Sequence, residues 1–270
     1  MDRFANTLAA MDFERLHPDR GRVSARDAAA ALRESAALPD DRPYLALNMV
    51  ATADGRVTID GRSGGIGNEA DRELFHELRA QVDAVMAGAG TVRTERYGRL
   101  VRDPDRRARR GEAGLEPDPL AVIVSARLAL TPDIPLLQDP DSRVVILTAS
   151  DDELEGCRAR VEYLRPDEAP AAPAELRERA ARLVLAPMLR KLRHDHGVRT
   201  VLCEGGPVLN GGLLREGLVD ELFLSVAPKL AGDSGPTVVS GPPLDGTAEM
   251  ELLTVMEAGG QLFLRYRLPH

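Results

Sequence analysis

A carboxylate followed by a glycine-rich turn is the first feature of this sequence that could do chemistry. The stretch Glu204-Gly-Gly-Pro-Val-Leu-Asn-Gly-Gly212 comes directly after an apolar run of strand length and opens a segment with helical character. A helix N-terminus offers unpaired backbone N–H groups and the positive end of the helix dipole. The stretch therefore predicts a phosphate or pyrophosphate site, and a tight strand–helix turn with close packing is the alternative.

Two further glycines, one turn into this segment, indicate that a neighbouring group approaches the helix closely. Gly211 and Gly212 each cost the helix roughly 1 kcal/mol relative to alanine. Such a cost indicates either tight packing on the sheet or close approach of a ligand.

A second glycine turn lies at Gly88-Ala-Gly90-Thr-Val-Arg93. It nearly matches the G-x-G-x-x-G dinucleotide pattern, but Arg93 stands where the third glycine belongs, and no clear β-α-β unit with an acid at the right distance follows. The sequence therefore disfavours a standard Rossmann domain. The remaining interpretation is a glycine turn that brings Thr91 to a ligand.

A third candidate region spans residues 48–80, with turns at Asp54-Gly55 and Asp60-Gly61 and the small-residue loop Ser63-Gly-Gly-Ile-Gly67. A mobile surface loop is an equally good interpretation of this region.

The sequence lacks the motifs of several other kinds of site: the chain has no P-loop pattern and no zinc-deaminase pattern. No metal site is expected at His194-Asp-His196, because histidines at a helix C-terminus are favourable against the dipole. The basic run Arg106–Arg110 is predicted to be a solvated loop.

Composition narrows the class of protein. The chain has 270 residues, 43% of them apolar and only 3% aromatic, with no tryptophan, so its core must be aliphatic. The net charge of −8 argues against a nucleic-acid binder. Cys157 and Cys203 do not form a disulfide framework. With no signal peptide and no membrane-length apolar run, the expectation is a cytoplasmic protein that binds no membrane.

Strand-like and helix-like segments alternate along the chain. Strands are expected at 44–52, 82–88, 119–125, 143–148, 158–164, 199–204 and 219–228, and a hairpin around Ala258-Gly-Gly260 over 250–268. Helices are expected at 24–38, 68–80 with Asn68 as N-cap, 187–197 with Pro187 as first residue, and 207–217; loops at 102–118 and 166–175. This order predicts an α/β protein with a mostly parallel central sheet, helices on both faces and a C-terminal antiparallel hairpin.

The three glycine-containing segments, taken in their order along the chain, resemble those of the RibD C-terminal reductase family of riboflavin biosynthesis. The similarity spans roughly residues 43–268 and is strongest in "LRAQVDAVMAGAGTV" (78–92) and "VLCEGGPVLNGGLLREGLVDEL" (201–222). The resemblance implies a dihydrofolate-reductase-like fold. It divides the chain into an N-terminal extension, 1–42, and a reductase domain, 43–270.

The resemblance also implies an oxidoreductase in which NADPH reduces C1 of the ribose of 5-amino-6-(5-phosphoribosylamino)uracil. The implied cofactor-binding residues are Gly65, Thr91, Glu95, Ser125, Gly205, Gly206, Pro207, Val208, Leu209, Asn210, Gly211 and Gly212. The implied substrate-binding residues are Asn48, Ser63, Arg79, Arg102 and Glu204. A guanidinium suits a substrate phosphate, and Glu204 could hold ribosyl hydroxyls. The proton donor stays open between Glu204, Asp54 and water.

The chain departs from the family pattern on the substrate side. The family's D-D-P-x-L-T-x-R is here Glu95-Arg-Tyr-Gly-Arg-Leu-Val-Arg102, and Gly65 replaces a tryptophan. Two alternatives therefore stand beside the main hypothesis: a reductase of the same fold for dihydrofolate or a dihydropterin, and a non-catalytic NADP-binding protein. The resemblance further implies a homodimer. Ser125, Arg127 and Thr91 could receive the 2′-phosphate of NADPH.

Overall fold

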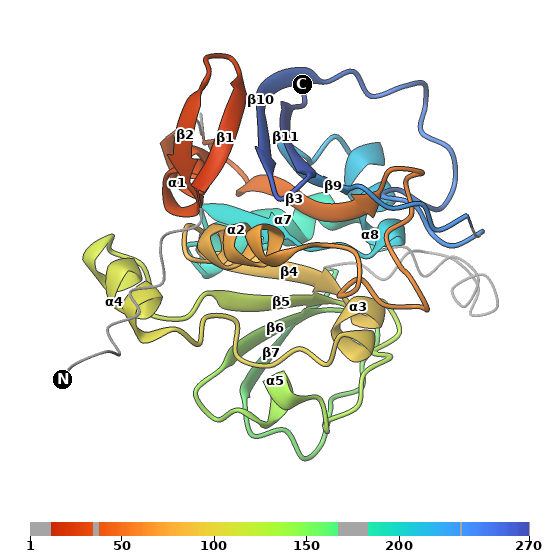
Figure 1. The fold of residues 1–270 in the computed structure, drawn as a ribbon. Coiled ribbons are helices and arrows are strands. Elements are labelled where there is room, and N and C mark those ends of the chain that lie inside the picture. Colours follow the sequence, from red (N-terminus) through yellow and green to blue (C-terminus); the bar gives the residue numbers. More distant parts are fainter. Residues whose placement is uncertain (1–11, 35–37, 167–182, 233, 270) are drawn as a thin grey trace.

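The protein is described by a computed structural model that covers residues 12–34, 38–166, 183–232 and 234–269 (Figure 1). Across these ranges the strands form one sheet in the order β2-β1-β10-β11-β9-β3-β8-β4-β5-β6-β7. Their bounds are β1 Asp12–His17, β2 Gly21–Ser24, β3 Tyr44–Thr52, β4 Ala84–Gly88, β5 Leu120–Val124, β6 Arg143–Leu147, β7 Arg160–Leu164, β8 Thr200–Cys203, β9 Glu221–Ala227, β10 Glu251–Ala258 and β11 Gln261–Arg267.

The sheet is parallel from β9 to β7 and antiparallel from β2 to β9. Its helices are α1 Ala25–Glu34, α2 Glu69–Arg79, α3 Ala89–Thr94, α4 Pro104–Glu112, α5 Pro135–Gln138, α7 Leu185–Asp195 and α8 Pro207–Arg215. None of the helices in the described part of the chain has the length and apolar character that a membrane span requires.

Two aliphatic cores cover the two faces of the sheet. Neighbouring strand residues alternate between them: Val85 packs in the core with Leu78 of α2, and Met86 packs in the core with Leu189 of α7. This alternation follows from the two-residue repeat of a strand. The predicted fold class, with helices on both faces and a C-terminal hairpin, is confirmed.

The N-terminal segment contributes to the same sheet. Strands β1 and β2 form a hairpin that pairs with β10, and Figure 1 shows this red hairpin beside the blue C-terminal one. The Phe13 ring meets the Phe263 ring edge-on at 4.9 Å. No strand was expected here, because the sequence of β1 is mostly polar. In the structure Phe13 is its one fully buried side chain.

Two local predictions were wrong. The predicted loop 102–118 contains α4, whose first turn is capped by the Asp103 side chain and begins with Pro104. α7 begins at Leu185, so Pro187 is its third residue, and the Glu216 carboxylate accepts the backbone N–H groups of Leu185 and Ala186. The predicted loop 166–175 lies, after its first residue, outside the described residues.

Candidate active site

One large cavity of about 1320 Å³ opens at the carboxyl ends of the parallel strands. The ends of β4, β5 and β8 contribute Gly88, Val124 and Glu204 to its wall. This edge of an α/β sheet is the usual place for a ligand, because the loops and helix N-termini meet there.

Most of the predicted site residues line this cavity. They are Asn48, Ser63, Arg79, Thr91, Glu95, Arg102, Glu204, Gly206, Pro207, Val208, Leu209 and Gly212. The remaining ones, Asp54, Gly65, Ser125, Gly205, Asn210 and Gly211, do not belong to its lining.

Glu204 is held by two other side chains of the cavity wall. The Arg79 guanidinium donates from Nε to Oε1 and from Nη2 to Oε2, both at 2.7 Å. The Tyr97 hydroxyl donates to Oε2 at 2.5 Å. Glu204 follows β8 directly, and its N–H donates to the carbonyl of Met86 in the neighbouring strand β4, which fixes its backbone.

Arg79 has little left to offer a substrate. Its Nη1 donates to the carbonyl of Leu100, and its guanidinium lies 4.2 Å from the ring centre of Phe75 and 5.3 Å from that of Tyr97. Burial alone would lower the pKa of Arg79, but the charge and hydrogen bonds of Glu204 raise it. Arg79 is therefore a permanent cation paired with Glu204 and is not a free phosphate ligand.

Arg102 is the contrasting arginine. It is exposed, lines the cavity, and has no ion pair with any residue that the structure describes. Its guanidinium lies over Gly98, where a Cβ atom would be only 2.4 Å from Nη2. This position leaves a cation available to an anionic group in the cavity.

Ser63 and Glu95 join two parts of the cavity wall. Both the backbone N–H and the hydroxyl of Ser63 donate to Glu95 Oε1 at 2.9 Å. Glu95 caps the C-terminus of α3, and Ser63 belongs to the loop after β3. An expected substrate-binding residue, Ser63, is thus hydrogen-bonded to an expected cofactor-binding residue, Glu95.

The glycine-rich turn places the N-terminus of α8 at the cavity. Pro207 is the first residue of α8, as predicted, and Val208 beside it is 66% exposed. Gly205 has a φ of +87°, a conformation that favours glycine, and its carbonyl accepts from the N–H of Gly88. The site of a Cβ on Gly206 is 3.2 Å from the Thr91 hydroxyl, so both glycine turns meet here.

The two later glycines of α8 have different surroundings. A Cβ on Gly211 would stand 2.3 Å from the carbonyl oxygen of Ser240, so packing against a loop explains this glycine. A Cβ on Gly212 would make an ordinary contact of 3.6 Å with Leu185, and Gly212 lines the cavity.

Asp54 lies outside the cavity lining, on an exposed turn. Its carboxylate accepts from the Thr52 hydroxyl and from the backbone N–H groups of Ala231 and Gly232. These hydrogen bonds, with Thr52 the strongest, hold the pKa of Asp54 well below its usual range. Asp54 therefore ties two loops together as a carboxylate and has no proton to donate at neutral pH.

The other predicted residues outside the lining also have structural partners. Ser125 Oγ accepts from the N–H of Ala129, and the Gly65 carbonyl accepts from Lys229. Asn210 is fully buried and donates to the carbonyl of Val238. Gly65 and Ser125 thus belong to turns that these bonds hold, and Asn210 ties α8 to the loop that carries Val238.

The basic run 106–110 is not a solvated loop. Arg106 and Arg109 both donate to Glu77 of α2, whose side chain is 5% exposed. Arg110 is buried and donates to the carbonyls of Arg79, Val82 and Glu116. Burial lowers the pKa of Arg110 to about 10. The arginines thus fasten α4 to the C-terminal end of α2, which carries Arg79.

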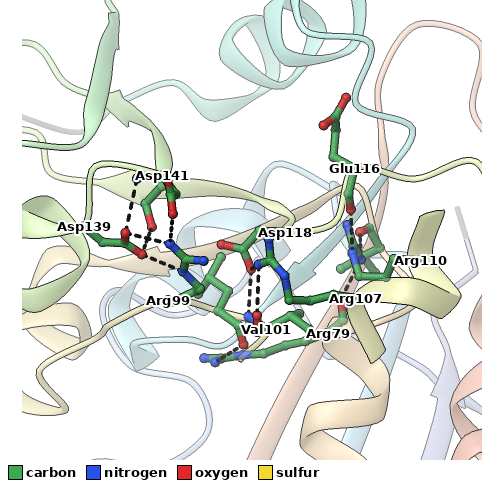
Figure 2. A network of polar contacts seen from close by, with 12 residues as sticks. Arg79, Arg99, Val101, Arg107, Arg110, Glu116, Asp118, Asp139 and Asp141 are labelled. Carbon is green, nitrogen blue, oxygen red and sulfur yellow. Dashed lines mark hydrogen bonds and ion pairs between the residues drawn. The ribbon is translucent and has the colours of Figure 1, made fainter. Parts of the chain in front are cut away.

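Figure 2 shows the polar contacts of Arg110 together with those of the neighbouring residues Arg99, Arg107 and Asp118. Arg99 binds Asp139 and Asp141, and Asp118 accepts from the N–H of Val101 and lies 4.0 Å from Arg107. The segment that includes Tyr97 and Arg102 is therefore anchored at several points. Sequence reasoning missed Tyr97 as a site residue; its only signal was its place in the segment where the family pattern is broken. Phe75 of α2, whose ring lies against the Arg79 guanidinium, also lines the cavity.

Comparisons with known proteins agree on one family. The family model of the RibD C-terminal domain matches residues 43–264. A 2,5-diamino-6-ribosylamino-4(3H)-pyrimidinone 5′-phosphate reductase of Methanothermobacter thermautotrophicus is 30% identical over 235 residues, covering 83% of this chain and 98% of the relative. The reductase of the same name from Archaeoglobus fulgidus is 32% identical, with 74% and 87% covered.

A solved structure shows the same fold. The pyrimidine reductase-like protein of Corynebacterium diphtheriae superposes with a TM-score of 0.70 at 21% identity, covering 92% of this chain and all of that one.

Proposed function

Since this chain belongs to the RibD C-terminal domain family, we propose that it is a pyrimidine reductase of riboflavin biosynthesis. It reduces C1 of the ribose in a 5-phosphoribosylaminopyrimidine to give the open ribityl chain. The observation that carries this proposal is the composition of one cavity. A glycine-rich helix N-terminus lies in its wall together with Glu204, which Arg79 holds, and Arg102, a cation with no ion pair in the described part of the chain.

The residues of the α8 end fit a dinucleotide. Gly206 and Gly212 leave room beside the helix N-terminus, and the backbone there suits a pyrophosphate. The bound cofactor supplies a hydride from C4 of its nicotinamide. We propose NADPH, because Arg215 lines the cavity and the exposed Arg127 follows β5, and both are cations suited to bind a 2′-phosphate.

Two other residues of the cavity lining, Arg102 and Glu204, fit a phosphoribosyl group. Arg102 is free to bind the phosphate, and Glu204 accepts a hydrogen bond from a ribosyl hydroxyl. Hydride addition at C1 breaks the bond to the ring oxygen, which takes up one proton. Among the candidates from the sequence, Asp54 is ionised and lies outside the cavity lining, so we propose that water delivers this proton while Glu204 positions the sugar.

The relatives' names and the sequence resemblance point to two pyrimidines that differ only in the base. The archaeal relatives are named for a 2,5-diamino-pyrimidinone, whereas the resemblance implied the deaminated uracil. Both carry the same phosphoribosylamino group, which is the part that Arg102 and Glu204 would recognise. We propose this group as the specificity element.

We also propose a homodimer in the cytoplasm, with 43–270 as the reductase domain. The face of the antiparallel strands that is turned away from α1 and α2 carries Leu224 of β9 beside Leu264 of β11, with Val255 of β10 next to them. On the same face Val226 lies beside Leu262, whose β10 neighbour is Glu257. Leu262 and Leu252 are each 39% exposed. An apolar sheet face of this kind is suited to a second copy of the same face around a two-fold axis.

The test is NADPH oxidation by the purified protein, followed by absorbance, with both pyrimidines and dihydrofolate offered in parallel. Turnover of a phosphoribosylaminopyrimidine alone is expected. Turnover of dihydrofolate alone would instead support the pterin alternative. NADPH binding without turnover of any of the three would support a non-catalytic NADP-binding protein.

A further inference from the structure

Tyr97 lines the cavity, and its hydroxyl points at the carboxylate of Glu204, the residue proposed to bind the sugar of the substrate. It donates to Glu204 Oε2 at 2.5 Å, the same oxygen that accepts from Arg79 Nη2. Burial and the Glu204 charge raise the pKa of Tyr97 well above 10, so the hydroxyl keeps its proton and remains a donor.

The backbone around Tyr97 is fixed on both sides. Its N–H donates to the carbonyl of Val92 in α3, and its carbonyl accepts from the N–H of Leu136 in α5. Arg96 just before it has a φ of +46°, in the left-handed region that costs a non-glycine residue free energy. The chain thus holds a strained turn that sets the direction of the tyrosine ring.

The Tyr97 hydroxyl changes how many acceptor directions of the Glu204 carboxylate remain for a substrate. A carboxylate offers about four lone-pair directions. Within the described residues, Oε1 accepts from Arg79 Nε, and Oε2 accepts from Arg79 Nη2 and Tyr97. Oε2 is therefore filled, and Oε1 retains one acceptor direction for a substrate hydroxyl.

We propose that Tyr97 is a positioning residue for the reductase reaction: its hydroxyl fills Glu204 Oε2, so that a ribosyl hydroxyl can bind Glu204 only through Oε1. This inference rests on the proposed function of the same cavity. Without the Tyr97 hydroxyl, the sugar can bind through either oxygen, and only one of these orientations presents C1 to the hydride.

The test compares Tyr97→Phe with a matched control, Tyr163→Phe. The control likewise removes one hydroxyl with an internal hydrogen bond, which here accepts from the N–H of Leu154, but Tyr163 does not line the cavity. A misplaced reacting group costs rate more than binding. Tyr97→Phe is expected to lower kcat by about 10-fold with a change in KM below about threefold and an unchanged Kd for NADPH. Tyr163→Phe should keep the wild-type kcat.

A double variant separates positioning from a general structural effect. If Tyr97 acts through Glu204, Tyr97→Phe should add no further loss of kcat in a Glu204→Gln background. Losses that multiply would overturn the inference, as would a Tyr97→Phe kcat within about twofold of wild type. A fall in kcat matched by a fall in folded protein would also overturn it.

Failure of the proposed function has a separate signature. In that case wild type and Tyr163→Phe both fail to reduce either pyrimidine. The inference is then decided by a crystal structure of Tyr97→Phe. A reoriented Glu204 carboxylate would support the role of the hydroxyl, and an unchanged carboxylate would overturn it.

Discussion

Arg79 and Glu204 form a bidentate ion pair between the last residue of α2 and the residue that follows β8. The two residues are 125 positions apart in the sequence, and both N–O distances are 2.7 Å. Their side chains are 9% and 2% exposed. Because the two charges cancel, this part of the cavity wall is polar but neutral, and the binding of a substrate phosphate is left to another cation.

Arg79→Lys should destabilise the protein strongly. An ammonium cannot reproduce the planar fork that binds both oxygens, so the buried Glu204 loses part of its compensation. We expect the free energy of unfolding to fall by about 3 kcal/mol. Urea unfolding measures this, with Arg267→Lys as control, because its pair with Glu251 is exposed at 44% and 63% and should contribute under about 1 kcal/mol. Equal losses in the two variants would contradict a buried, bidentate pair.

Gly211→Ala and Gly212→Ala should act on different properties. A Cβ on Gly211 meets the Ser240 carbonyl at 2.3 Å, so this variant should lose about 1–3 kcal/mol of stability. A Cβ on Gly212 finds ordinary contacts, so helix propensity should raise stability by up to about 1 kcal/mol. Since Gly212 lines the cavity, only its variant should weaken NADPH binding directly. Thermal unfolding and fluorescence titration give the two readouts; similar results for both variants would contradict the assignment.

The elements that sequence patterns predicted well are those whose signals are local. β3 follows the predicted bounds 44–52, and α2 begins after its predicted cap, because Asn68 accepts the N–H of Asp71. α4 escaped prediction because it has no apolar stripe; its arginines pair with Glu77, 29 or more positions away.

The candidate site was predictable in its membership but not in its contacts. The resemblance supplied Arg79, Arg102 and Glu204 as neighbours of a substrate, and all three line the cavity. That Arg79 is bound by Glu204 while Arg102 is free depends on side-chain directions, which no motif encodes. Tyr97 belongs to the same category, since its role depends on a turn and a partner 107 positions away.

Glu77→Gln should make stability less dependent on pH. Burial would raise the pKa of Glu77, but hydrogen bonds from Arg109 and Arg106 outweigh it and lower the pKa below its usual value of 4.5. A carboxyl with a lowered folded pKa stabilises the protein fully above the unfolded value and loses this contribution as pH falls through the folded value. The difference in Tm between wild type and Glu77→Gln should thus be largest near neutral pH and shrink at strongly acidic pH.

The matched control for this prediction is Glu112→Gln. Glu112 also belongs to the α2–α4 region but is exposed on α4. Its replacement should leave the Tm profile parallel to that of wild type. A Glu77→Gln difference in Tm that stays constant from neutral to acidic pH would show that Glu77 contributes through packing and not through its charge.

Leu262→Glu should dissociate the proposed homodimer. A charge at this position would lie on the proposed dimer face, between Val226 of β9 and Glu257 of β10. The new carboxylate would lose its hydration in the dimer and would repel Glu257. Light scattering coupled to size exclusion measures the mass. Leu230→Glu is the control, because Leu230 is 80% exposed and lies on the loop after β9, outside this face. A wild-type monomer, or a dimer that Leu262→Glu leaves intact, would exclude this interface.

Arg102→Ala should weaken binding of the substrate phosphate and nothing else. Arg102 is exposed and unpaired within the described residues, so its loss leaves no buried charge and should not change Tm. A charge-assisted hydrogen bond contributes about 1.5–3 kcal/mol, so KM for the phosphorylated pyrimidine should rise by about 10- to 100-fold. The KM for NADPH should stay unchanged, since Arg102 is not among the proposed cofactor-binding residues. The dephosphorylated substrate provides the internal control: wild type and Arg102→Ala should reduce it with the same KM. Equal losses with both substrates would instead place the phosphate elsewhere and make Arg102 a residue of the cavity's shape.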